Sequence, residues 1–90
     1  MNWFVYVILT AKGKLYTGIS TDPERRFVEH LCDRKKGAKF FRSDSPVVMI
    51  HLEEFDTMSE ALKREIAIKN WPTAKKRKTF LSNLQYELSV

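Results

Sequence analysis

The chain has 90 residues, of which 43% are hydrophobic and 30% are charged, and it carries a formal net charge of +5. This length predicts one domain over residues 1–90, and the composition excludes an intrinsically disordered chain. The single cysteine, Cys32, excludes an intrachain disulfide and fits a reducing compartment, so we expect a cytoplasmic protein.

The first predicted element is a strand over residues 3–10, WFVYVILT. This run is rich in β-branched and aromatic side chains and is apolar at odd and even positions alike, which favours a strand that is covered on both faces. It is too short to span a bilayer, and no basic residue precedes it. We therefore expect neither a leader peptide nor a membrane anchor.

Residues 15–20, LYTGIS, are predicted to return as the second strand of a hairpin, with Gly13 taking a positive φ in the connection. A loop with an odd number of residues would place Tyr6 and Tyr16 on one face, beside Gly18. A two-residue loop would place them on opposite faces. A glycine within a strand often marks the close approach of another group, although cross-strand aromatic pairs are also ordinary features of sheets.

A helix is predicted from the segment TDPERRFVEHL, with two overlapping start signals. Asp22 can cap the helix with Pro23 at its first position, or Thr21 and Glu24 can form a capping box.

Arg26 and His30 lie one turn apart on this helix, at one edge of an expected apolar stripe of Phe27 and Leu31. Arginine presents a planar donor fork that suits a phosphate, and histidine can transfer a proton near neutral pH. The alternative is an ordinary solvated helix edge.

The segment 33–46 is predicted to be mostly loop, with a helical turn near Lys39, and a third strand follows over residues 46–55. We expect His51, within this strand, to be structural. A last helix is predicted from Thr73 to about Asn83. The resulting order, β-β-α-β-α-α, describes an α+β fold with a small three-stranded antiparallel or mixed sheet flanked by helices.

Basic residues interleaved with aromatic ones favour nucleic acid as the partner. The candidates for phosphate contacts are Arg34, Lys35, Lys36, Lys39, Arg42, Lys75 and Lys76, and Phe40 and Phe41 could stack on a base. A solvated charge run without a specific partner is the alternative.

A second helix is predicted to begin at a capping box of Thr57 and Glu60. At about 100° per residue, one apolar arc that should face the core includes Met58, Ala61, Leu62, Ile66 and Ile68. Glu65 and Lys69 fall inside the same arc, where an amphipathic helix would not place charges.

Two explanations of this charged pair remain open. Glu65 and Lys69 could form an i, i+4 ion pair, which contributes only a few tenths of a kcal/mol at a surface, whereas burying both charges would cost several kcal/mol each. Alternatively, this part of the helix opens onto a cleft. A cleft carboxylate suits a hydrated Mg²⁺, which often takes one or two protein carboxylates together with phosphate oxygens. We favour the metal ligand.

The polar residues singled out above occur in a characteristic order: Tyr6, Tyr16 within YTG, Arg26, His30 and a helical Glu65. This ordered series resembles the GIY-YIG nuclease domain superfamily, and especially its small stand-alone bacterial members, the UPF0213 group. The resemblance covers residues 3–80. It is carried by the segments VYVI, LYTGIST, ERRFVEH, GAKF, EEF and EALKREIAIK. The first family tripeptide keeps only its tyrosine here, and the middle residue of the second is threonine.

The resemblance implies a metal-dependent endonuclease or phosphodiesterase that acts on DNA, with RNA as the less favoured substrate. Glu65 would hold one Mg²⁺ or Mn²⁺, and Arg26 would contact the phosphate. Tyr6, or else Tyr16, would position or deprotonate the attacking water. His30 could assist proton transfer, and Lys69 could neutralise charge near the metal or contact phosphate.

Because relatives usually gain specificity from a second domain, a partner protein or a homodimer could supply targeting here. DNA repair or recombination is the broadest process that the resemblance implies. The alternative function is a nucleic-acid-binding module of the same fold without turnover. A protein-interaction domain that uses Trp3, Phe40 or Trp71 as anchors is a third possibility.

Overall fold

The computed structural model describes residues 1–33 and 35–88, so Arg34, one of the predicted phosphate contacts, lies outside the described residues. Its elements are β1 (Trp3–Thr10), β2 (Leu15–Ser20), α1 (Pro23–Cys32), the 3-10 turn η1 (Lys39–Arg42), β3 (Pro46–Phe55), α2 (Met58–Lys69) and α3 (Thr73–Leu88). The predicted β-β-α-β-α-α order is confirmed. The last helix continues beyond Asn83, because no glycine or proline follows in NLQYEL to stop it.

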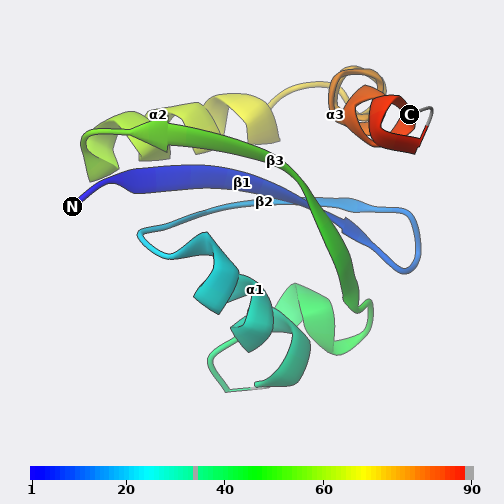
Figure 1. Cartoon of the computed structure of the whole chain (residues 1–90), viewed down its shortest axis with the longest axis horizontal. Coiled ribbons are helices and arrows are strands. Elements are labelled where there is room, and N and C mark those ends of the chain that lie inside the picture. The colour runs from blue at the N-terminus through cyan, green and yellow to red at the C-terminus, as the bar shows by residue number, and fades with distance from the viewer. Residues whose placement is uncertain (34, 89–90) are drawn as a thin grey trace.

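The sheet has the strand order β2-β1-β3, and both pairings are antiparallel. Helices α2 and α3 cover one face, whereas α1 and η1 cover the other (Figure 1). The central strand β1 is therefore enclosed, and the side chains of Val5, Tyr6, Val7 and Ile8 are each at most 1% exposed. This burial on both faces confirms the interpretation of its apolar pattern.

The hairpin between β1 and β2 has the odd loop length on which the placement of the two tyrosines depended. The Thr10 N–H donates to the Lys14 carbonyl at 2.9 Å, which leaves a three-residue loop. Gly13, at the last loop position, has φ of 82°, a conformation that glycine adopts without steric cost. Tyr6 and Tyr16 consequently lie on the same face of the hairpin, on the side of α1.

Both predicted helix starts are confirmed by their capping contacts. The Asp22 side chain accepts from the Arg25 N–H at 3.2 Å, and Pro23 is the first residue of α1. At the start of α2, the Thr57 hydroxyl oxygen accepts from the Glu60 N–H at 3.2 Å. These local contacts satisfy N–H groups that have no partner within the helix.

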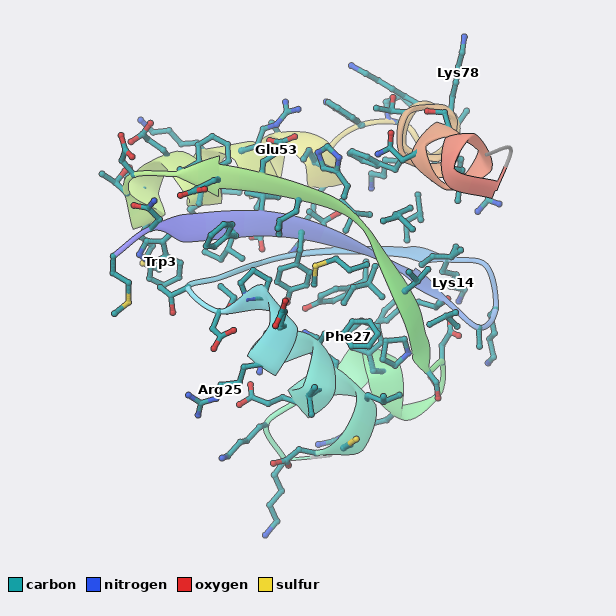
Figure 2. All side chains as sticks on the ribbon, in the orientation of Figure 1. Trp3, Lys14, Arg25, Phe27, Glu53 and Lys78 are labelled. Carbon is teal, nitrogen blue, oxygen red and sulfur yellow. The ribbon has the colours of Figure 1, made fainter. Side chains whose placement is uncertain are left out.

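The two faces of the sheet carry separate apolar clusters. On the α2 and α3 face, Val5 and Val7 pack with Ala61, Ile68 and Phe80. On the α1 face, Tyr6 and Ile8 pack with Phe41 and, among partly buried residues, with Phe27, which Figure 2 labels between α1 and the sheet. The second cluster thus contains the Tyr6 phenol, and the candidate site lies around that group.

No helix among the described residues is long and apolar enough to cross a membrane.

Candidate active site

The Tyr6 ring lies against the backbone of the neighbouring strand at Gly18, its cross-strand partner. A Cβ atom built on Gly18 would lie 2.4 Å from Tyr6 Oη and 2.5 Å from Tyr6 Cζ. The ring of Tyr16 lies beside it, with the two ring centroids 6.3 Å apart. The close approach expected at this glycine is therefore made by the tyrosine itself.

We expect Gly18→Ala to lower the free energy of unfolding by about 1–3 kcal/mol, the usual cost of overpacking, because the buried Tyr6 ring has to shift to admit the methyl group. Urea unfolding of the variant measures this cost. A double-mutant cycle with Tyr6→Leu provides the control. An equal cost of Gly18→Ala in the wild-type chain and in the Tyr6→Leu variant would contradict this explanation.

His30 is buried, with 5% of its surface exposed, and both ring nitrogens are engaged. Its Nδ1 accepts from the Ala38 N–H at 3.0 Å, and its Nε2 lies 2.9 Å from Tyr6 Oη. Because a backbone N–H can only donate, Nδ1 of the neutral ring carries no proton and Nε2 carries it. His30 therefore donates a hydrogen bond to the Tyr6 oxygen.

Burial, together with the charge of Arg26, lowers the pKa of His30 from 6.5 to about 4. The imidazole is consequently neutral at pH 7, which makes it a fixed donor to Tyr6 rather than a group that changes charge near neutrality.

Since the pKa of His30 is lower in the folded chain than in the unfolded one, the unfolded chain binds the extra proton first on acidification. Stability should fall as the pH drops from about 6.5 to about 4, by up to roughly 3 kcal/mol, and this group should cause no further loss below that range. Urea unfolding of the wild type and of His30→Gln at several pH values isolates the contribution. Parallel pH profiles of the two proteins would contradict it.

Arg26 reaches the same phenol from α1. Its guanidinium donates to Glu29 Oε1 at 3.1 Å and to the Lys36 carbonyl, which hold it in place. The pKa of Tyr6 is raised overall, chiefly by burial and then by the neighbouring Tyr16, and the charge of Arg26 and its hydrogen bond to Tyr6 offset only part of this rise. Two donors, the guanidinium and the His30 imidazole, are thus directed at one buried phenol oxygen.

The structure corrects the expected apolar stripe of α1. Leu31 is 52% exposed, and His30 takes the inward position instead. The helix faces the sheet through Phe27 and His30, because the tyrosines there offer a polar partner as well as an apolar surface.

The apolar arc predicted for α2 is also wrong in part. Ala61 and Ile68 are fully buried, but the other three members of the arc are exposed: Met58 at 49%, Leu62 at 38% and Ile66 at 51%. The helix contacts the sheet through a narrow stripe of two residues that lie two turns apart. The remaining apolar side chains stand beside this stripe, toward solvent.

Two charged residues flank the buried stripe of α2, one on each side. Arg64 extends to β3, where its Nε and Nη2 donate to the Glu53 carboxylate at 2.8 and 3.2 Å. Glu65 lies on the other side of the stripe, and α2 packs there against β2. Its charge raises the pKa of both Tyr6 and Tyr16, so the carboxylate is within electrostatic range of both phenols.

Glu65 and Lys69 combine features of both explanations that the sequence left open. The Lys69 Nζ atom lies 3.7 Å from Glu65 Oε1, so an i, i+4 ion pair is present, but it is longer than a hydrogen bond. The Lys69 side chain is 51% exposed and the Glu65 side chain 13%. The carboxylate is therefore set into the surface, while the ammonium group remains in solvent.

As a possible metal ligand, Glu65 fits a divalent cation that keeps most of its waters better than one coordinated only by protein side chains. Among the described residues, no group of three or more His, Cys, Asp or Glu side chains could hold a metal ion. A recessed carboxylate within electrostatic range of two phenols matches the ligand use of Mg²⁺, which keeps several waters and takes few protein ligands. Mn²⁺ prefers the same oxygen donors.

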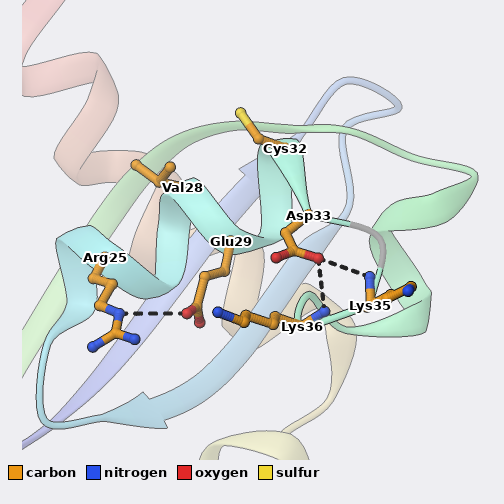
Figure 3. Close-up of a pocket in the computed structure, with 7 residues that line it drawn as sticks. All are labelled: Arg25, Val28, Glu29, Cys32, Asp33, Lys35 and Lys36. Atoms are coloured by element: carbon orange, nitrogen blue, oxygen red, sulfur yellow. Dashed lines mark hydrogen bonds and ion pairs between the residues drawn. The ribbon is translucent and has the colours of Figure 1, made fainter.

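The predicted phosphate-binding residues are distributed over several elements. Lys35 and Lys36 lie in the turn after α1, where their backbone N–H groups donate to Asp33 Oδ1, beside a pocket along α1 (Figure 3). Lys39 and Arg42 belong to η1. At the start of α3, the Lys75 ammonium lies 4.1 Å from the Trp71 ring centroid.

Two further positions differ from what the sequence suggested. Phe41, a candidate for base stacking, is only 6% exposed and packs 4.5 Å from the His30 ring and 4.7 Å from the Tyr16 ring, centroid to centroid. Asp44, which the sequence did not single out, is buried and accepts from Thr10 Oγ1 at 2.6 Å and from the Lys12 N–H at 2.9 Å. No sequence signal identified Asp44, because its partners are distant along the chain.

His51 is engaged on the opposite face of the sheet, with its Nε2 2.6 Å from Glu53 Oε2. This contact agrees with a structural role.

In a comparison with known proteins, the family model described as the GIY-YIG catalytic domain matches residues 2–78. A UPF0213 protein of Cupriavidus necator is 47% identical over 75 residues, covering 83% of this chain and 79% of that relative. A UPF0213 protein of Halobacterium salinarum is 45% identical over 76 residues, covering 84% and 96%. The solution structure of a UPF0213 protein from Bacillus halodurans matches with a TM-score of 0.55 and 33% identity, covering 88% of this chain and 82% of that one.

Proposed function

The chain belongs to the GIY-YIG catalytic domain family, and on this premise we propose that it is a metal-dependent nuclease that hydrolyses a phosphodiester bond of DNA. The family's description as a catalytic domain points to nuclease-type chemistry on nucleic acid. The names of the UPF0213 relatives specify no metal, substrate or process. The finer assignment therefore depends on the residues of the site.

The observation that carries the proposal is the environment of the Tyr6 oxygen. It receives hydrogen bonds from the neutral His30 imidazole and from the Arg26 guanidinium, and it lies within range of the Glu65 charge. Donors of this kind stabilise negative charge on an oxygen. A phenol that served only for packing would need neither a charged donor nor a second donor with a fixed tautomer.

Glu65 would hold a single Mg²⁺ or Mn²⁺, which would polarise the scissile phosphate, stabilise the leaving oxygen and neutralise the carboxylate charge that raises both tyrosine pKa values.

Three other side chains would have separate roles in the hydrolysis. Tyr6 is favoured over Tyr16 as the group that positions the attacking water, because its oxygen has the two donors described above. It would take the proton of that water only as the phenolate, after losing its own proton to solvent, and the two donors would stabilise the negative charge of that form. His30 holds that oxygen in place through Nε2–H. Arg26, 31% exposed at its side chain, offers its remaining donors to a phosphate and offsets charge in the transition state.

A partner protein or a second copy of the chain is the proposed source of targeting, and Lys35, Lys36, Lys39, Arg42, Lys69, Lys75 and Lys76 are the proposed contacts to the DNA backbone.

The experiment that tests the proposal is a cleavage assay on labelled single-stranded, duplex and branched DNA in Mg²⁺, Mn²⁺ and chelator. Cleavage in either metal and its loss in chelator are expected. Tight, chelator-insensitive binding without cleavage would instead identify a nucleic-acid-binding module.

A further inference from the structure

A groove separate from the tyrosine cluster lies where the β1–β2 hairpin, η1 and the first turns of α3 meet. Three cationic side chains, Lys14, Lys76 and Arg77, line it together with Phe40. Arg77 donates to the Gly13 carbonyl at 2.6 Å, which ties α3 to the hairpin and fixes this side of the groove. Figure 2 shows Lys14 at the hairpin end of the sheet, away from the N-terminus of β1.

The groove adjoins the candidate active site on both of its sides. On one side, the rings of Phe40 and Tyr16 have centroids 5.4 Å apart. On the other side, Lys76 Nζ donates to the Lys69 carbonyl at 3.1 Å, and the Lys69 ammonium pairs with Glu65. The groove is thus connected to Tyr16 through Phe40 and to Glu65 through Lys69, so a strand bound at the candidate site could also reach the groove.

The chemistry of the groove suits a nucleotide. Its cations match phosphate, and each ammonium or guanidinium group retains donors beyond those used within the chain. Phe40 is 37% exposed, and the buried Phe41 supports it edge-on at 5.3 Å between ring centroids. An exposed ring held in this way offers a face on which a base can stack, and stacking of this kind tolerates any base sequence.

We propose that this groove binds an unpaired nucleotide of the substrate strand, with the base stacked on Phe40 and the flanking phosphates on Lys14, Lys76 and Arg77. Bases within a duplex are already stacked on both faces, so they can reach the ring only after leaving the helix. The preferred substrate accordingly has a single-stranded stretch next to the scissile phosphodiester. This inference rests on the proposed nuclease function.

Fluorescence anisotropy with labelled oligo(dT) and with a DNA hairpin duplex, both in chelator, tests the groove without requiring turnover. Phe40→Leu, which keeps an apolar side chain but removes the ring, should weaken oligo(dT) binding about tenfold. It should leave duplex binding and the salt dependence unchanged. Phe40→Tyr should retain the wild-type affinity. Val47→Ala, at an exposed apolar position on the edge strand β3 at the opposite side of the sheet, is the control.

Lys14→Gln tests the electrostatic contribution of the groove. It should lower the slope of log affinity against log salt concentration by about 1, because one phosphate contact is lost.

An equal loss of affinity for oligo(dT) and duplex with Phe40→Leu, or no loss of affinity for either, would overturn the inference. If no DNA is cleaved in any metal but the selective loss with Phe40→Leu is found, the groove assignment stands and the nuclease function fails. If duplex and single strand are cleaved equally and Phe40→Leu has no effect on binding, the groove assignment fails alone.

Discussion

Replacing Glu65 by glutamine should reduce metal-dependent cleavage by about 100- to 1000-fold, since the metal contributes several kcal/mol of transition-state stabilisation. Glutamine keeps the size of the side chain, which is 13% exposed and paired with Lys69 at 3.7 Å, and removes the charge that a hydrated cation requires. Initial cleavage rates over a range of Mn²⁺ and Mg²⁺ concentrations measure the effect.

The same substitution should not weaken DNA binding in chelator, because a recessed carboxylate repels phosphate when no metal is bound. Glu54→Gln is the matched control, since Glu54 is exposed on β3 and should leave the rate unchanged. Cleavage by Glu65→Gln at the wild-type rate, with the same metal dependence, would place the metal on another residue.

Removing the Tyr6 hydroxyl should produce the second large effect, a loss of about 10²- to 10⁴-fold in cleavage rate for Tyr6→Phe, the range expected for a general base. The phenyl ring would still lie over Gly18, so the packing on the α1 face is retained. DNA affinity in chelator should change little, because the proposed contacts to phosphate are made by Arg26 and the basic residues rather than by Tyr6. Single-turnover cleavage with excess enzyme separates this effect on chemistry from any effect on binding.

Tyr6→Phe should also lower stability by about 1–3 kcal/mol, because it leaves the buried His30 Nε2–H without its acceptor. Tyr16→Phe is the informative comparison. Its ring lies 6.3 Å from that of Tyr6, between centroids, and burial likewise raises its pKa. If Tyr16→Phe abolishes cleavage while Tyr6→Phe retains it, Tyr16 is the group that takes the proton.

The elements of this fold were predictable because they are encoded locally. Runs of β-branched and aromatic residues defined β1 and β2, and the caps at Asp22 and Thr57 set the first residues of two helices. Gly13 gave the hairpin its loop. Each of these signals acts between residues a few positions apart, so a single sequence displays it.

The inward face of α2 was predicted less well, and the reason is geometric. Helical periodicity gave a broad apolar arc, but only Ala61 and Ile68 are fully buried. The observed rotation of α2 accompanies the contact between Arg64 and Glu53, which lie on different elements, so periodicity within the helix could not predict it. Arg64 pairs with β3, while the neighbouring Glu65 carries a charge that is within electrostatic range of both tyrosines.

The sequence by itself determined the order of strands and helices and the residue types from which a nuclease site could be built: phenols, a guanidinium, an imidazole and a helical carboxylate. Only the tertiary structure decided the protonation state and the hydrogen-bond partners of these groups. The Ala38 N–H sets the His30 tautomer from outside the helix, and burial sets its neutral charge. These properties depend on the dielectric environment and on donors brought together from distant segments, which no local pattern encodes.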